Sequence, residues 1–193
     1  VDKSSKALNH IEYSCVVNLV LTVPRRADPW QTGAQGGPQE GSDMSTVIAH
    51  FNVARLLHPP GDPRVAEFTS NTQRVNAVAE RSPGFIWRWA DDTAEVDGSG
   101  GYQAVDADPC LAISLSVWES RADLQHFVQK TVHGAFLRRR AEWFAPWDGP
   151  NYVIWPWRRD GIPTVAEGWA RLDRLARQGA TPDAFDFAFD PAA

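Results

Sequence analysis

The chain has 193 residues, 43% of them hydrophobic, which suits one compact domain with an added segment, because a single core usually serves about 100 to 200 residues. The formal charge of -5 gives no broad basic field, so we expect no nucleic-acid partner. Cys15 and Cys110 are too few and too far apart for a disulfide framework, and no apolar run approaches the length of a membrane span. We therefore expect a cytoplasmic protein with no membrane partner.

Residues 1–43 show no sustained hydrophobic period and end in TGAQGGPQEGSD, a composition that cannot support a core. Met44 opens a regular strand pattern. We interpret 1–43 as an N-terminal extension, flexible or of upstream origin, and 44–193 as the domain. The alternative is a natural arm in which NLVLTV forms an edge strand against a neighbour.

Strands and helices follow in a clear order from Met44. Alternating or apolar patterns predict strands at 46–56, 85–90, 110–119 and 151–157. Helix starts are predicted at Asp62 with Pro63, at Ser120 with Asp123, and at Thr164 with Glu167. Gly134 is expected to interrupt the second helix and Gly179 to end the last one. Pro156 favours an edge position or a bulge for the last strand, and the alternating phenylalanines of DAFDFAFD must dock somewhere.

This order, strand, helix, strand, strand, helix, strand, predicts an α+β, ferredoxin-like fold with an antiparallel sheet. Its helices cover one face of the sheet. The other face would stay wet in a monomer, yet the strands carry few charged residues on either face. A second copy that covers this face, giving a homodimeric α/β barrel, is the simplest solution.

Strand alternation predicts that His50 and Asn52 share one face, as do Ser114, Ser116 and Trp118 on a neighbouring strand. If these faces coincide, polar groups and an aromatic wall form a pocket. Asn76, in the apolar face of the first helix, would add an amide. Further flat walls for a small aromatic ligand are expected from Trp87, Trp143 and Trp155. The alternatives are an internal hydrogen-bond network and an aromatic core.

Two further residues are candidates for catalysis. Arg140 falls within an aromatic helical stripe, where it would anchor the anion of a substrate, unless it forms an internal ion pair or reaches out to water. His133 faces solvent if its helix is straight. If the glycine break turns it inward, it becomes a general base or a metal ligand. His126 is expected to be solvated. Sequence motifs for nucleotide cofactors and structural zinc are lacking, so we expect no cofactor.

The segments AHFNVARL, DPRVAEF, SVWES, LRRRAEWF and TPDAFDF resemble a bacterial family of unknown function (DUF3291-type) in the dimeric α/β-barrel superfamily. The resemblance implies the fold and the dimer. More remotely, SVWES followed by a helix is similar to antibiotic-biosynthesis monooxygenases and to haem-degrading enzymes. The haem degraders use an asparagine on the first strand, and Asn52 matches it in position. They also use a tryptophan and a ligand histidine on the second helix, where this chain has Phe127 and Leu137. His133 lies one turn before the position of that ligand.

Together these observations predict a small-molecule tailoring enzyme acting on an aromatic or polycyclic substrate, of the cofactor-independent monooxygenase type. In this hypothesis Arg140 holds the substrate anion, His133 or His50 takes a proton, and Asn52 with Ser116 orients oxygen atoms. The alternatives are a cyclase or isomerase using the same pocket, a haem-binding protein with His133 as the ligand, and a dimeric module without catalysis.

Overall fold

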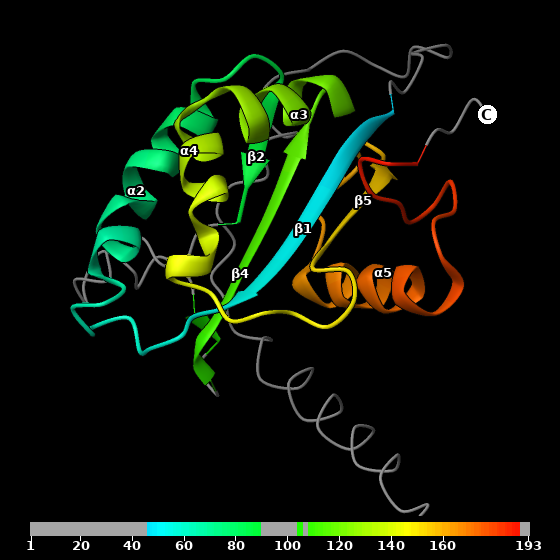
Figure 1. Ribbon diagram of the computed structural model, residues 1–193. Helices are drawn as coiled ribbons and strands as arrows, with labels where there is room; N and C mark the ends of the chain where they lie inside the picture. The colour runs from blue at the N-terminus through cyan, green and yellow to red at the C-terminus, as the bar shows by residue number, and fades with distance from the viewer. Residues whose placement is uncertain (1–45, 90–103, 106–107, 190–193) are drawn as a thin grey trace, which may run out of the picture.

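A computed structural model describes residues 46–89, 104–105 and 108–189 (Figure 1). The expected extension 1–43 and the acidic loop 91–101 lie outside the described residues. The strands are β1 (Val47–Arg55), β2 (Phe85–Arg88), β3 (Ala104–Val105), β4 (Asp108–Trp118) and β5 (Tyr152–Trp157). The helices are α2 (Ala66–Glu80), α3 (Arg121–Lys130), α4 (Val132–Arg138), the 3-10 turn η1 (Arg140–Glu142) and α5 (Val165–Gln178).

The strands pair in the order β2-β4-β1-β5, every pair antiparallel, and the short β3 also pairs with β4. This order and the helices between the strands confirm the predicted α+β, ferredoxin-like fold. Pro156 lies in β5, which pairs with β1 alone among the described strands. The predicted edge position of this strand is therefore confirmed.

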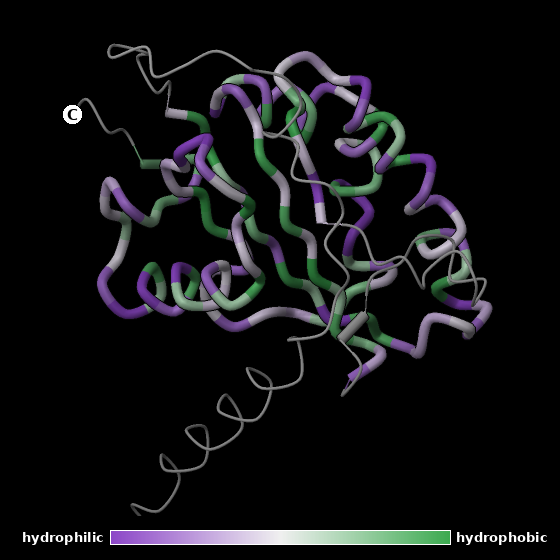
Figure 2. The backbone as a smooth tube through the Cα atoms, turned by 180° about the vertical axis from the view of Figure 1, so that it is seen from behind, coloured by the Kyte–Doolittle hydropathy of each residue, from purple (hydrophilic) through white to green (hydrophobic). Residues whose placement is uncertain are grey.

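The helices lie on both sides of the sheet. In Figure 1, α2, α3 and α4 cover one face, and α5 crosses the opposite face. In Figure 2 the strands run mostly green and white through the middle, while purple residues gather on the outer turns of the helices. No helix in the described part of the chain is both long enough and apolar enough to span a bilayer.

Two of the predicted helix starts are confirmed and one is wrong. The side chain of Ser120 accepts a hydrogen bond from the backbone of Asp123, and Thr164 with Glu167 forms a full capping box. Asp62 does not cap a helix, because its carboxylate is engaged by the backbone N–H and guanidinium of Arg64. The helix begins only after this turn, at Ala66.

Helix α5 packs on the face of β1 that carries Phe51. A Cβ at Gly168 would lie 2.5 Å from the Phe51 ring, so only glycine lets the helix come this close, and Trp169 meets the same ring edge-on at 5.3 Å. The core on this side includes Ala49, Leu115 and Trp155. Helix α5 thus covers part of the face that we expected a second copy to cover. The homodimer stays a prediction.

The aromatic tail docks, as expected, against β5 on the face covered by α3. Phe185 pairs through its backbone with Ile154, and its side chain is buried. The guanidinium of Arg121, in α3, donates hydrogen bonds to the carbonyls of Phe187 and Phe189. The end of the described chain is therefore held to α3 as well as to the sheet.

Candidate functional site

The polar residues predicted to share a sheet face do share it, and it is the face covered by α2, α3 and α4. His50 lies directly opposite Ser116, and Asn52 directly opposite Ser114, in the β1–β4 register. Side chains opposite each other in an antiparallel pair have Cβ atoms about 4.5–5.5 Å apart. His50 and Asn52 themselves are about 7 Å apart along the strand. These four side chains form the centre of a candidate site.

Water reaches this part of the covered face. Ser114 is exposed in the middle of β4, although its neighbours Ile113 and Leu115 are buried on the opposite face. His50, Asn52 and Ser116 are half-buried. The helices therefore do not seal the polar half of the sheet, and a small solute can approach the same atoms that water reaches.

His133 joins these residues from the helix layer. Helix α3 ends at Lys130, and the side chain of Thr131 caps a new helix, α4, by accepting a hydrogen bond from the backbone of His133. The break therefore falls at Thr131, not at Gly134 as predicted. Gly134 is buried inside α4, where a Cβ would lie 2.6 Å from the carbonyl oxygen of Gln129. This close approach explains the glycine, and the new helix direction turns His133 inward.

The hydrogen bond of His133 fixes its tautomer. Its Nδ1 lies 3.1 Å from the carbonyl oxygen of Val128. A carbonyl only accepts, so Nδ1 carries the hydrogen and, in the neutral ring, Nε2 keeps a free lone pair. Burial lowers the pKa of His133 below its ordinary value, while the Val128 carbonyl raises it in part by stabilising the protonated ring. His133 is therefore a neutral imidazole with a defined basic atom.

His50 is also held neutral. Burial is the main cause that lowers its pKa to about 3, and a positive charge on His133 lowers it further. The two rings thus lie near enough to affect each other, although one comes from β1 and the other from α4. The ring of His50 makes no hydrogen bond to the described residues. Its nitrogen atoms are free to bind water or a ligand.

Two neighbouring hydrogen bonds decide whether the free atoms of Asn52 and Ser116 donate or accept. The Nδ2 of Asn52 donates to the carbonyl of Asn151 at 3.0 Å, which leaves Oδ1 as a free acceptor. The indole N–H of Trp118 donates to the Oγ of Ser116 at 3.0 Å. Because that bond uses Ser116 as an acceptor, its hydroxyl hydrogen can be donated to another group.

Tyr152 and Arg88 are neighbours that we did not predict from the sequence. The ring of Tyr152 lies 6.0 Å from that of His50, its hydroxyl accepts a hydrogen bond from the backbone of Phe187, and burial raises its pKa. Arg88 lies opposite Ser116 from the other side of β4. Its guanidinium is paired with Glu80 of α2 at 2.7 Å. Strand alternation could have placed both residues on the face of His50 only if the strand order and register were known.

Comparisons with known proteins give a family but no activity. The family model described as "Domain of unknown function (DUF3291)" matches residues 47–193. The chain belongs to the DUF3291 family. A crystal structure of the NE2512 protein of unknown function from Nitrosomonas europaea matches with 13% identity and a TM-score of 0.41, covering 63% of this chain and 96% of that one. No curated protein matches the chain.

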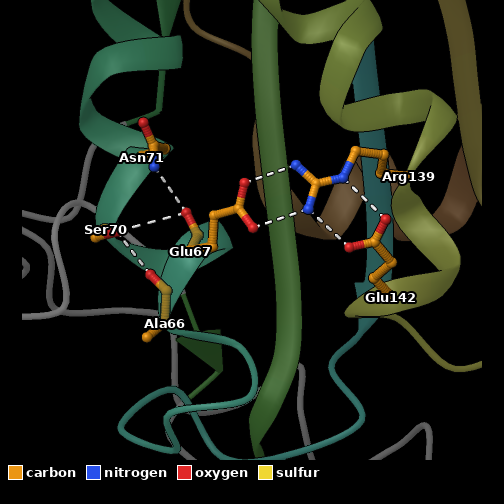
Figure 3. A network of polar contacts seen from close by, with 6 residues as sticks. All are labelled: Ala66, Glu67, Ser70, Asn71, Arg139 and Glu142. Carbon is orange, nitrogen blue, oxygen red and sulfur yellow. Dashed lines mark hydrogen bonds and ion pairs between the residues drawn. The ribbon is translucent and has the colours of Figure 1, made fainter.

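In this DUF3291 chain Arg140 lies outside the aromatic helical stripe in which it was expected, and its role in holding a substrate anion stays a prediction. Helix α4 ends at Arg138, and Arg140 is an exposed residue of the turn η1, because the helix does not continue into the expected stripe. The arginine that is held is Arg139 (Figure 3). It pairs with Glu67 of α2 at 2.6 Å and with Glu142 at 2.7 Å, and its guanidinium lies 4.8 Å from the Trp143 ring centre. This network joins α2 to the segment after α4.

Of the tryptophans predicted to form ligand walls, Trp118 lies on the face of the polar residues, and Trp87, Trp143 and Trp155 lie elsewhere in the DUF3291 domain. Trp118 is fully buried, stacked on Phe127 at 5.3 Å, so it supports the site from below and has no free face. Trp143 is buried in a separate cluster at the end of α4. Trp87 and Trp155 lie on the opposite sheet face, with the core under α5. Tyr152 is thus the aromatic ring nearest to His50 in the described contacts.

Three other helical residues considered in the sequence are Asn76, His126 and Leu137. Asn76 is half-buried in α2 and makes no hydrogen bond to the described residues, so its amide stays a candidate for ligand binding. His126 is exposed, as expected. Leu137, the residue at the place of the ligand histidine of haem degraders, is also exposed.

Metal binding has limited support in the described residues. Among them, no group of three or more histidine, cysteine, aspartate or glutamate side chains could hold a metal ion. A haem needs only one protein nitrogen. His133 fits that role, since its Nε2 lone pair is free and its Nδ1 is oriented by a carbonyl, the usual partner of a ligating histidine.

Proposed function

We propose that this protein is a small-molecule enzyme that removes a proton from a weakly acidic aromatic substrate bound between the sheet and the helices, with His133 as the base. The observation that carries the proposal is the hydrogen bond from Nδ1 of His133 to Val128, which aims an unprotonated Nε2 away from that carbonyl. The same bond stabilises the ring after it takes a proton.

The other groups have roles that follow from their free atoms. Ser116 can donate its hydroxyl hydrogen to the oxygen on which negative charge develops, and Asn52 can accept a hydrogen from the substrate. His50 remains neutral beside His133, so it can bind and orient the substrate without competing for the proton. The ring of Tyr152 offers an aromatic surface for packing.

Two outcomes share this first step. Return of the proton at another atom makes the reaction an isomerisation. Addition of molecular oxygen to the substrate carbanion gives a hydroperoxide, and loss of water from it turns the CH2 group into a carbonyl. This is a cofactor-independent monooxygenation, in which oxygen is the oxidant, one of its atoms stays in the product and the other leaves as water. We propose the second outcome as the native reaction, and oxygen consumption during turnover separates the two.

The proton-transfer step is tested with 2-tetralone, an enolisable aromatic ketone. We expect the protein to accelerate exchange of its acidic C–H hydrogens in D2O, followed by proton NMR. Replacing the base, as in His133→Gln, should lower the rate about 100-fold or more, since a positioned base contributes about 10²–10⁴-fold. His126→Gln, at an exposed histidine of α3, is the matched control and should leave the rate unchanged. Equal rates in both variants would refute the role of His133.

Haem binding is the second candidate, favoured by the orientation of His133. His133 would supply the axial nitrogen, and the iron would supply redox chemistry. Titration of the protein with haemin should then give a saturable Soret band that disappears in His133→Gln. A band that is absent, or that is the same in the variant, would eliminate this candidate.

A further inference from the structure

The hydrogen bonds within the site decide which of its polar atoms remain free for a ligand. Asn52 must direct Nδ2 to the Asn151 carbonyl, because a carbonyl cannot donate, and so Oδ1 is left over. His133 must direct its N–H to Val128, and so the lone pair of Nε2 is left over. Both of these leftover atoms are acceptors, whereas the hydroxyl hydrogen of Ser116 is a leftover donor. A ligand that satisfies the two acceptors has to present hydrogen-bond donors.

The charges around the site add a second constraint. His50 and His133 are held neutral by burial. Two described cations lie on this sheet face. Arg88 is neutralised by Glu80 at 2.7 Å, and the guanidinium of Arg121, which lies near Tyr152, is engaged by the carbonyls of Phe187 and Phe189. An anionic ligand would give up its hydration and would face the free acceptor atoms of Asn52 and His133, with the Ser116 hydroxyl as a donor, so its charge would be poorly compensated. An uncharged ligand avoids that cost.

We propose that the site selects uncharged aromatic molecules bearing a hydroxyl group, such as phenols and enols, and that Asn52 sets this specificity by accepting the hydroxyl hydrogen. The proposal takes the location of the site from the proposed function and names its ligand class. It also differs from the substrate anion that the sequence led us to expect, because Arg140 is an exposed residue of η1 and not part of an aromatic helical stripe.

The exposure of the residues agrees with a small ligand. Asn52 and Ser116 are half-buried and Ser114 is exposed, so the polar atoms line a face that solvent enters. Once the ligand displaces water there, a hydroxyl paired with Oδ1 of Asn52 gains a hydrogen bond in a partly desolvated place. A methyl ether of the same shape leaves Oδ1 without a donor, and this difference should be about tenfold in affinity.

The test compares three probes of similar shape by calorimetric titration at pH 7. The first, 2-naphthol, carries a neutral hydrogen-bond donor. The second, 2-methoxynaphthalene, carries only a neutral acceptor, and the third, 2-naphthoate, carries a negative charge. We expect 2-naphthol to bind with an affinity about tenfold or more above that of each of the other two probes. In Asn52→Leu the preference for 2-naphthol over the ether should fall to about one.

Several results would overturn the proposal. They are a 2-naphthoate affinity equal to or above that of 2-naphthol, an unchanged preference in Asn52→Leu, and no saturable binding of any probe. Binding selectivity is measured without turnover, so it is independent of the tetralone assay. Selectivity without hydrogen exchange would refute the proton-transfer role alone, and exchange without selectivity would refute the ligand class alone.

Discussion

Burial, more than neighbouring charge, sets the protonation state of the two histidines in the site. His50 and His133 come from a strand and from a helix, and each is kept neutral because the protein withdraws it from water. A group whose folded pKa is lowered takes up protons more readily after unfolding. Its contribution to stability is therefore full above the unfolded value near 6.5 and is lost as the pH falls toward the folded value, about 3 for His50.

This gives a prediction at the scale of one side chain. Between pH 7 and pH 5 the wild-type free energy of unfolding should fall by about 1 to 2 kcal/mol more than that of His50→Gln, after allowance for partial exposure. Urea denaturation at both pH values measures this difference. His126→Gln serves as the control and should keep the wild-type slope. A wild-type slope no steeper than that of His50→Gln would show that His50 is not buried as described.

The sequence was sufficient for the residues whose positions depend on alternation along one strand. His50, Asn52, Ser114 and Ser116 share a face because side chains alternate, and this was predictable. The position of Arg140 was not predictable from the sequence, because it depends on where a helix ends. A local hydrogen bond from Thr131 starts α4 anew, and the helix stops at Arg138. Such a change of direction leaves no periodic signal.

Contacts between elements depend on how closely two backbones approach. Gly168 of α5 lies against the ring of Phe51, and an added Cβ would come within 2.5 Å of that ring. We expect Gly168→Ala to destabilise the protein by about 1–3 kcal/mol, the usual cost of overpacking a core. Chemical denaturation measures the loss. Gly61→Ala is the control, because no atom lies within 4 Å of a Cβ there. A neutral Gly168→Ala would contradict the described packing of α5.

Helix capping was the most predictable feature at the scale of elements. Thr164 with Glu167 and Ser120 with Asp123 cap their helices because both partners are local in sequence. Asp62 is also of a residue type that favours the N-cap position. Its carboxylate binds Arg64, two residues away, and the helix begins later, at Ala66. Competition between two nearby partners for one carboxylate decides such cases, and the residue pattern alone does not show which partner prevails.

At the scale of the whole molecule, the topology brings the site together. The order β2-β4-β1-β5 places β1 between β4 and β5, so His50 has Ser116 on one side and Ile154, next but one to Tyr152, on the other. The fold class followed from the order of elements. The position of α5 did not, because the sequence shows an amphipathic helix without showing which face of the sheet it covers.

The homodimer remains a prediction at this scale. Helix α5 covers β1 and β5 on the face that a second sheet would contact, and Ala49, Val153 and Trp155 are already buried there. Sedimentation analysis decides between the two arrangements. A dimer would support the expectation from the sequence, whereas a monomer at all concentrations would assign the covering role to α5 alone.

The role of His133 as a neutral base is tested most directly by NMR of the histidine ring nitrogens, in protein labelled with ¹⁵N at histidine. Because burial lowers the pKa of His133 below 6.5, we predict that at pH 7 its ring is neutral, with hydrogen on Nδ1 and none on Nε2, and that added 2-naphthol shifts the Nε2 signal. His133→Gln assigns the signals. A doubly protonated His133 ring at that pH, or a hydrogen on Nε2, or signals that 2-naphthol leaves unmoved, would show that His133 is not the base of the site.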